Sequence, residues 1–449
     1  MAKETSKNSK RTPSSEAAQG TSAPIKRTPS GEATQGTSAP ISRTPSSETA
    51  QGTSASTSRA PSGEAAPGAS ASPAPLKRGW TTGACATAAT KAALTALLDG
   101  DFPDPVTITL PGGQTPAFTL TTSAQGPNWA QASITKDAGD DPDITHGALI
   151  EVRVATSATP GLHFHAGAGV GVVTKAGLPI SVGAPSISPV PRQMMTEVVA
   201  KRLDLTRQGL DLSISIPDGE ALAAQTWNGR LGIVGGLSIL GTTGIVVPYS
   251  CAAWIHSIHR GIDVARAEGL RHVAAATGNR SEIGIQALYG LPSHALLDMG
   301  DFAGALMKYL RAHPIPRLSI AGGLGKISKL AQGHGDLHSA RSQVDVNFLR
   351  GLSGQDLPEA ETAAQAYAAA TDPAALVRAI ADRAKGQAQA RLGPSIEIDV
   401  QLFSRMGDHL GGSESGEPLL DESSLDGPAL DETALGEPTL GEPTLGEPV

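Results

Sequence analysis

Residues 77–100 read KRGWTTGACATAATKAALTALLDG, and the rest of the chain is organised around this stretch. Alanine recurs at every fourth position, which is the spacing of one helical face. Thr81 or Thr82 is a suitable N-cap, and Gly100 stands where a helix-ending glycine belongs. The pattern predicts a buried helix whose alanine face lets another backbone approach closely.

Two cations and two hydroxyl side chains precede this helix, namely Lys77, Arg78, Thr81 and Thr82. The first turn of a helix carries N–H groups without helical partners, and the positive end of the helix dipole lies there. Such a terminus favours carboxylate or phosphate groups. The four residues are therefore candidate anion-binding residues, although a Thr-Thr-Gly sequence also serves simply as a cap.

The chain has a middle part and two tails of different composition. Residues 10–73 repeat a unit of 16 residues rich in Ser, Thr, Pro, Gly and Ala, and the chain ends in LGEPT repeats. Such sequences cannot bury enough apolar surface to offset chain entropy. We predict disordered tails at 1–76 and 412–449, and between them an α+β domain at 77–248 and an α/β domain at 249–411.

Formal charge is concentrated in the tails. The whole chain carries −8; residues 1–76 carry +3 and residues 412–449 carry −10, which leaves −1 for the middle. A nearly neutral middle lacks the basic footprint of a nucleic-acid-binding protein. No apolar run approaches the ~20 residues of a membrane span. The two cysteines form no CxxC pair, so we expect a cytoplasmic protein without nucleic-acid or membrane partners.

Four β-rich segments follow the first helix. Each is bounded by Gly, Pro or Asp, which predicts strands, and PGGQTP at 111–116 predicts a hairpin turn. Antiparallel strands with one helix make an α+β module. The expected strands are 106–110, 117–120, 130–135 and 149–154, with another at 210–216.

The segment HFHAGAGVGVVT, from His163, resembles a dinucleotide-binding fingerprint. That fingerprint requires glycines between a strand and a helix, whereas valines here continue as strand. We predict a glycine-lined surface instead. A helix is expected at 191–203 with Pro191 at its first position, and Arg192 near its start is either an anion contact or a solvated arginine.

Strands and helices alternate after residue 249, which predicts a largely parallel sheet in a three-layer α/β domain. A helix capped by Asp372 is expected at 373–389, and a closing strand at 396–403. The other expected strands are 272–277, 295–298 and 318–321, and the other expected helices are 249–269, 281–289, 301–312 and 326–331.

Two glycine-containing loops, TGNRSE at 277–282 and GGLGK at 322–326, each follow an expected strand and begin a helix. Ligands of open parallel sheets bind beyond the carboxyl ends of the strands. In this interpretation Glu282 binds ribose hydroxyls and Asp298 adds a carboxylate from a third strand end; the alternative is two ordinary turns. The candidate ligand-binding residues are Thr277, Gly278, Asn279, Glu282, Gly322, Gly323 and Gly325.

Histidine pairs do not indicate a metal site. His163 and His165 would share a strand face, and His334 and His338 a helix face, but neither pair has an HExxH context or a cysteine partner. We interpret them as structural or solvated histidines and predict no metal bound by the protein. The sequence also contains no P-loop and no G-x-S-x-G elbow.

Five blocks in fixed order resemble the CbiD family, the cobalt-precorrin-5B C1-methyltransferases of cobalamin biosynthesis. The resemblance spans roughly residues 77–405. Several long blocks in one order are more specific than any single short motif. The blocks are RGWTTGACATAATKAA, GVGVVTKAGLPISVGAPSISPVPRQMM, TWNGRLGIVGGLSILGTTGIVVPYS, TGNRSE and AGGLGKISKLAQGHGDLHS.

This resemblance implies transfer of a methyl group from S-adenosylmethionine to C1 of cobalt-precorrin-5B, a corrinoid intermediate, giving cobalt-precorrin-6A. It implies that the strand-end residues bind the cofactor, that cobalt belongs to the substrate, and that neighbouring pathway enzymes are further partners. No catalytic residue is identified. The implied clamps for the carboxylate arms of the macrocycle are Lys77, Arg78, Thr81, Thr82, Lys175, Arg192 and Arg230.

Two other functions stay open at this stage. One is a non-catalytic corrinoid-binding protein of the same pathway, against which the retained basic and strand-end residues argue. The other is a nucleotide-dependent enzyme, against which the missing Walker lysine argues. The glycine motif of common methyltransferases and the motif of other tetrapyrrole methylases are not evident, so the cofactor residues rest on strand-end position and resemblance.

Overall fold

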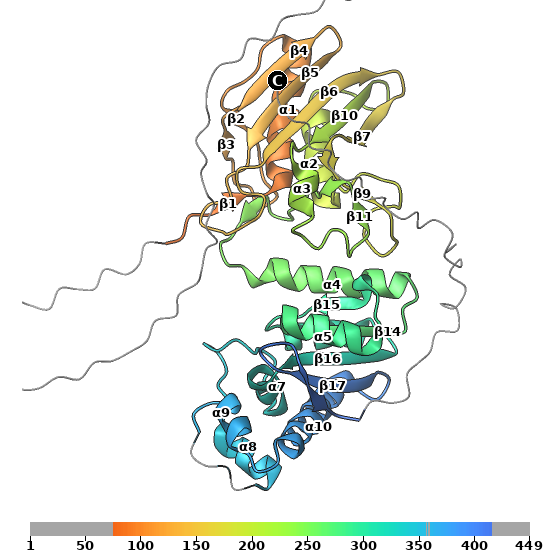
Figure 1. The fold of residues 1–449 in the computed structure, drawn as a ribbon. Helices are drawn as coiled ribbons and strands as arrows, with labels where there is room; N and C mark the ends of the chain where they lie inside the picture. Colours follow the sequence, from red (N-terminus) through yellow and green to blue (C-terminus); the bar gives the residue numbers. More distant parts are fainter. Residues whose placement is uncertain (1–74, 356, 358–359, 415–449) are drawn as a thin grey trace, which may run out of the picture. The chain divides into compact units, whose positions relative to one another are not determined.

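The computed structural model describes residues 75–355, 357 and 360–414 (Figure 1). The predicted tails lie outside the described residues, apart from 75–76 and 412–414. In the part of the chain that is described, no helix has the length and apolar character needed to cross a membrane.

Helix α1, Thr82–Asp99, confirms the predicted first helix. Thr81 Oγ1 accepts a hydrogen bond from the Ala84 N–H at 3.2 Å, which caps the start, and Gly100 ends the helix with φ of 93°. Its alanine-rich surface is almost entirely buried and packs against two neighbouring strands of the N-terminal sheet. Small side chains allow this close approach, because protein interiors are close-packed.

The N-terminal sheet is mixed. Its order is β4-β5-β6-β10-β7, in which all neighbours are antiparallel except the parallel pair β10–β7. The expected strands do pair antiparallel, but β4 was not predicted. Strand β7 contains the two histidines that were expected to share a strand face, and its parallel pairing with β10 makes the sheet mixed. The strands are β4 (Thr122–Gly126), β5 (Trp129–Thr135), β6 (Leu149–Ser157), β7 (Gly161–Ala166) and β10 (Gly209–Ser215).

Helix α2, Pro189–Ala200, begins two residues before the predicted start. Ser188 occupies the N-cap position, so Pro189 and not Pro191 takes the first helical position, where its fixed φ and missing N–H cost nothing. The remaining elements here are short: β1 (Gly79–Trp80), β2 (Val106–Thr107), β3 (Ala117–Phe118), β8 (Gly169–Val170), β9 (Val172–Val173), α3 (Gly219–Ala223), β11 (Ile233–Val234), β12 (Gly236–Leu237) and β13 (Ile245–Val246).

The C-terminal sheet is largely parallel, as predicted. Its order is β15-β14-β16-β17-β18, and only β18 runs antiparallel to its neighbour. From β14 the chain adds β15 on one side and then β16 on the other, so a topological switch point lies between β14 and β16. The strands are β14 (His272–Ala276), β15 (Leu296–Asp298), β16 (Arg317–Gly323), β17 (Glu397–Phe403) and β18 (His409–Gly412).

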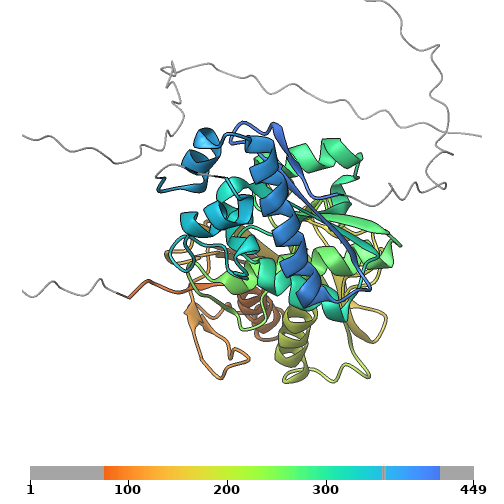
Figure 2. The same cartoon turned by 90° about the horizontal axis from the view of Figure 1, so that it is seen from below.

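Helices cover both faces of this sheet (Figures 1 and 2). Helix α5 (Asn279–Tyr289) packs on one face over a small apolar cluster. The other face carries the large core, to which α4 (Cys251–Ala267), α6 (Ala303–Ala312), α7 (Leu324–Ala331) and α10 (Pro373–Leu392) contribute. Asp372 caps α10 as predicted; the 3₁₀ turn η1 (Ser293–Ala295), α8 (Val346–Ser353) and α9 (Ala363–Ala369) were not predicted.

The sheet face under α5 carries a buried polar network. Arg317 Nη2 lies 3.3 Å from Asp399 Oδ1, and both side chains are 2% exposed. Ser319 Oγ donates to Asp399 Oδ1 at 2.6 Å, and Tyr289 donates from α5 to Asp399 Oδ2 at 2.7 Å. These partners satisfy a carboxylate that would otherwise be costly to bury. Helix α5 is therefore attached to the sheet partly through hydrogen bonds.

Candidate active site at the carboxyl ends of the parallel strands

The loops that follow β14 and β16 lie next to each other at the switch point. The Thr277 N–H donates to the Ala321 carbonyl at 2.9 Å. Lys326 Nζ, from α7, donates to the Thr277 carbonyl at 2.9 Å. The structure therefore places the two glycine-containing loops side by side, as the sequence predicted. The ligand that they bind stays a prediction.

Three glycines of these loops border open space. A Cβ built on Gly278 or Gly325 would meet no atom within 4 Å, and one on Gly323 would meet only the Phe403 carbonyl oxygen at 3.9 Å. Gly322 differs, because a Cβ there would lie 2.7 Å from Thr277 Oγ1 and 2.8 Å from a side-chain carbon of α7. Gly322 thus serves packing between the loops, whereas the other three leave backbone accessible to a ligand.

Arg230 and Glu282 pair with each other across this site. Arg230 Nη1 lies 2.8 Å from Glu282 Oε2, and Nη2 lies 2.6 Å from Oε1. The Glu282 side chain is only 9% exposed, and its hydrogen bonds raise the pKa of Arg230 above the ordinary value. The sequence assigned these residues to different ligands, and the structure joins them.

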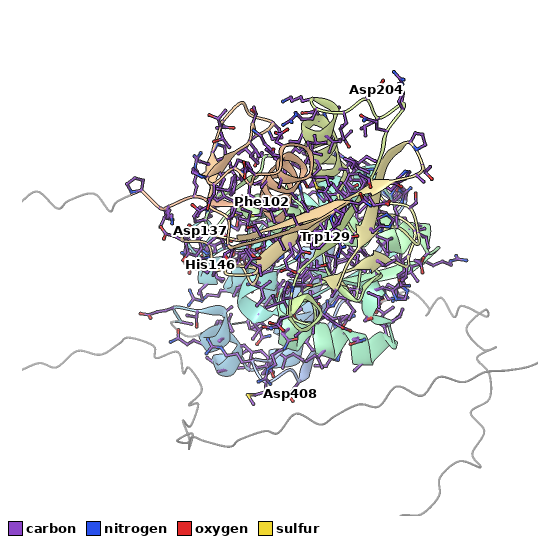
Figure 3. All side chains as sticks on the ribbon, turned by 90° about the horizontal axis from the view of Figure 1, so that it is seen from above. Phe102, Trp129, Asp137, His146, Asp204 and Asp408 are labelled. Carbon is purple, nitrogen blue, oxygen red and sulfur yellow. The ribbon has the colours of Figure 1, made fainter. Side chains whose placement is uncertain are left out.

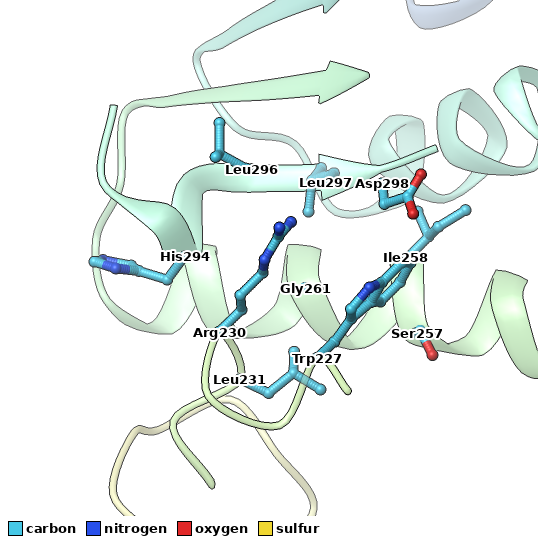
Figure 4. A pocket seen from close by; sticks show the side chains of 10 residues that line it. All are labelled: Trp227, Arg230, Leu231, Ser257, Ile258, Gly261, His294, Leu296, Leu297 and Asp298. Atoms are coloured by element: carbon cyan, nitrogen blue, oxygen red, sulfur yellow. The ribbon is translucent and has the colours of Figure 1, made fainter. Parts of the chain in front are cut away.

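Asp298 ends β15 and lines a crevice that β15 forms with α4 and the turn around Arg230 (Figure 4). Burial and the Glu282 carboxylate raise the pKa of Asp298 to about 6, against the opposing influence of Arg230, the Gly300 N–H and Lys326. The water-accessible space is about 20 Å³, room for about one water molecule. The crevice is lined by Trp227, Arg230, Leu231, Ser257, Ile258, Gly261, His294, Leu296, Leu297 and Asp298.

Aromatic rings gather beside this carboxylate. Trp254 Nε1, from the first turn of α4, donates to the Asp298 carbonyl at 2.9 Å. The Trp254 ring lies edge-on to Trp227 with centroids 6.0 Å apart, and 6.1 Å from Phe302. Trp254 nevertheless stays 43% exposed. Its indole is thus fixed in orientation while one surface faces solvent, an arrangement that suits stacking against a flat ligand.

Backbone N–H groups at the start of α1 already have partners within the chain. The Gly83 N–H donates to the Leu240 carbonyl at 2.9 Å, and the Ala84 N–H donates to Thr81 Oγ1. Thr82 Oγ1 accepts from the Leu240 N–H at 2.9 Å. The Ala84 contact is the predicted N-cap, whereas the partner of the Gly83 N–H was not predicted. Leu240, far along the chain, covers the Gly83 N–H, which no local pattern reveals.

Most of the predicted cationic clamps already have partners in the chain. Lys77 Nζ lies 2.6 Å from Asp137, whose carboxylate is also 4.0 Å from His146 (Figure 3). Lys175 Nζ lies 2.7 Å from Glu268 Oε2.

Arg192 donates to the Ile187 and Pro185 carbonyls at 2.8 and 3.0 Å, and burial lowers its pKa. Its guanidinium also lies 4.9 Å from the centre of the Phe164 ring. These contacts favour a structural role for Arg192. Arg78 is exposed, and its backbone forms a bridge with Gly139.

Among the described residues, no group of three or more His, Cys, Asp or Glu side chains is placed to hold a metal ion. His165 Nε2 lies 2.9 Å from Asp211, and His163 Nε2 lies 3.1 Å from the Thr159 carbonyl oxygen. This one pair of histidines therefore has protein partners that do not depend on a metal.

Fold and site together define an α/β protein whose two strand-end loops lie at the carboxyl ends of a parallel sheet, the position where such sheets bind ligands. The family model described as CbiD matches residues 69–248, and the model described as CbiD, C-terminal domain, matches residues 336–414. The chain belongs to the CbiD family.

This chain is similar to curated relatives over most of their length. The chain is 54% identical to the cobalt-precorrin-5B C(1)-methyltransferase of Paramagnetospirillum magneticum, over 75% of this chain and 98% of that protein. The enzyme of the same name from Brucella anthropi is 61% identical, over 62% of this chain and 76% of that protein. A solved cobalamin biosynthesis protein of Archaeoglobus fulgidus is 27% identical, over 56% of this chain and 78% of that chain, with a TM-score of 0.31.

Proposed function

We propose that this chain is a methyltransferase of cobalamin biosynthesis that methylates C1 of cobalt-precorrin-5B. The observation that carries the proposal is 54% identity over 98% of a relative named for that activity. The substrate brings its own cobalt, so the reaction asks for no metal site in the protein. Enzymatic methyl transfer chiefly requires that the methyl donor and the accepting carbon are aligned.

We propose S-adenosylmethionine as the methyl donor, bound at the two strand-end loops. A sulfonium methyl donor, when bound, supplies a methyl group that a carbon nucleophile can accept directly. The open space beside Gly278, Gly323 and Gly325 supports this placement, because a ligand can approach the backbone there. Glu282 supports it as well, since a carboxylate paired with arginine keeps lone pairs for a hydroxyl donor.

Arg78 is the strongest proposed contact for the carboxylate arms of the corrinoid, because its side chain is exposed. Lys77, Lys175 and Arg230 can reach such arms only by sharing or exchanging their present carboxylate partners. Thr81 and Thr82 already bind backbone groups, so their proposed contact with substrate is weaker.

The division into domains at 77–248 and 249–411 stays our proposal. Two separate apolar clusters support it, one around α1 and the N-terminal sheet and one around the C-terminal sheet. Cys85 and Cys251 are both free thiols, which supports the proposed cytoplasmic location. Neighbouring enzymes of the pathway are the proposed protein partners.

The test is incubation of the full chain with isotopically labelled S-adenosylmethionine and cobalt-precorrin-5B, followed by mass analysis of the corrinoid. We expect a product heavier by one labelled methyl group. Binding of the corrinoid without product would favour the non-catalytic alternative. Calorimetry with S-adenosylmethionine and with ATP separates a methyltransferase from a nucleotide-dependent enzyme. A methyltransferase should bind S-adenosylmethionine and not ATP.

A further inference from the structure

The methyl transfer of the proposed function moves a unit of positive charge onto the macrocycle, which a proton acceptor can relieve. A new bond from C1 to the methyl carbon forms with an electron pair of the macrocycle, while the bond from the donor sulfur to that carbon breaks and leaves its pair on sulfur. The macrocycle thereby gains one unit of positive charge. Loss of one proton restores the balance, and no oxidant or reductant is needed.

Asp298 stands beside the proposed donor site. In the register of the parallel sheet, Asp298 at the end of β15 pairs with Ala276 at the end of β14. The next two residues after Ala276 are Thr277 and Gly278, which begin the first of the two loops. A carboxylate on this neighbouring strand end therefore projects from the same edge of the sheet as the glycines that border open space.

The other carboxylates at this edge already face cations. Glu282 of α5 is held by both guanidinium nitrogens of Arg230. Asp301, before α6, has its Oδ1 3.0 Å from Lys326 Nζ of α7. For Asp298 no salt bridge occurs among the residues that the structure describes. Its negative charge is offset by Arg230 and Lys326, without an ion pair to either, and by the Gly300 N–H.

Two further observations suit a proton acceptor. The raised pKa of Asp298, about 6, means that the carboxylate predominates near neutral pH yet holds a proton well enough to take one. Proton-transfer groups work best when their pKa lies near the working pH. The Trp254 indole also binds the Asp298 carbonyl at 2.9 Å, which fixes the backbone that carries the carboxylate.

We propose that the Asp298 carboxylate accepts the proton that the macrocycle loses when its C1 is methylated, an inference that rests on the proposed function. The groups that face Asp298 are Glu282 from α5, Arg230 from the glycine-rich segment, and Lys326 from α7. Arg230 and Lys326 keep it ionised in the resting enzyme, and Glu282 increases its affinity for the proton.

The experiment measures the turnover number for methylated corrinoid against pH for the wild type, Asp298→Asn, Asp298→Glu and the matched control Asp301→Asn. We expect the wild-type rate to rise with pH around 6. Asp298→Asn should lower the rate by about 10²–10⁴-fold and lose this pH limb, while calorimetry shows unchanged affinity for S-adenosylmethionine. Asp298→Glu should restore part of the rate together with the limb, and Asp301→Asn should keep the limb.

Asp298→Asn that keeps its rate within about threefold, or that is slow but keeps the limb at pH 6, would overturn the inference. Retained donor affinity shows that the variant is folded; if that affinity is lost, the presence or absence of the limb in Asp298→Glu decides. A wild-type protein that binds the donor but forms no methylated product contradicts the proposed function itself, and is thereby distinguished from failure of Asp298 alone.

Discussion

Arg230 and Glu282, which are 52 positions apart in the chain, meet in a two-pronged ion pair with nitrogen–oxygen distances of 2.8 and 2.6 Å. The pair connects the turn at 228–232, just before β11, to the first turn of α5. The carboxylate is nearly buried while the guanidinium is one-third exposed. The pair can therefore stabilise the fold and still present the Arg230 guanidinium to a ligand.

Glu282→Ala is expected to lower the free energy of unfolding by about 1.5–3 kcal/mol, the usual value of hydrogen bonds to charged groups. The loss arises because Arg230 then loses both of its hydrogen bonds to a carboxylate. Urea unfolding measures it. Glu268→Ala is the control, because it breaks the more exposed pair with Lys175 and should cost less than about 1 kcal/mol. Equal losses in the two variants would contradict a special structural role for Glu282.

Gly322→Ala and Gly325→Ala should have opposite effects on the stability of the folded protein. Alanine at 322 places a methyl group 2.7 Å from Thr277 Oγ1, so we expect a loss of about 1–3 kcal/mol from overpacking. Alanine at 325 enters open space within α7 and should stabilise the helix by up to about 1 kcal/mol. Only the second variant should remain stable yet bind S-adenosylmethionine more weakly. Thermal unfolding and calorimetry test both, and unchanged donor affinity of Gly325→Ala would count against this binding site.

Asp298→Asn should stabilise the protein by an amount that depends on pH. The folded state raises the pKa of Asp298 from 3.8 to about 6, so between these values the folded protein holds a proton that the unfolded chain has lost. Stability that this proton provides is complete below about pH 4 and is lost as pH rises through 6. The variant should therefore melt above the wild type at pH 8, with an advantage that vanishes near pH 4. An advantage independent of pH would contradict the raised pKa.

Arg78→Ala and Arg192→Ala separate substrate binding from folding. Loss of the exposed Arg78 should raise the KM for the corrinoid by about 10–100-fold, the equivalent of one charge-assisted contact, with an unchanged melting temperature. Loss of Arg192 should lower the melting temperature, because it removes the donor to two carbonyls, and should leave KM nearly unchanged. Steady-state kinetics and thermal unfolding decide. The reverse pattern would show that Arg192 binds the corrinoid and that Arg78 is structural.

Elements with local signals were predictable from the sequence. Thr81 and Asp372 stand directly before the two long helices that they cap, so both starts could be read from composition. The alternation of apolar residues and histidines in GLHFHA indicated a strand, but its parallel pairing with β10, 48 positions along the chain, could not be predicted from a local pattern. The two strand-end loops of the site were predicted, but the ion pair between Arg230 and Glu282 was not. Arg230 and Glu282 were both identified, yet their choice of each other depends on tertiary structure.

The attachment of α5 to the sheet affects the local stability of the site. Its apolar contacts are a small cluster, whereas the opposite face of the sheet carries the large core, and much of the remaining attachment runs through Tyr289 and Asp399. Helices with few buried contacts open in independent, low-energy excursions long before global unfolding. The amides of α5 should therefore exchange with solvent ahead of those in α10. Gly278 is the N-cap residue of α5, so a ligand bound there would stabilise the helix against local unfolding. Ligand binding should therefore slow amide exchange along α5.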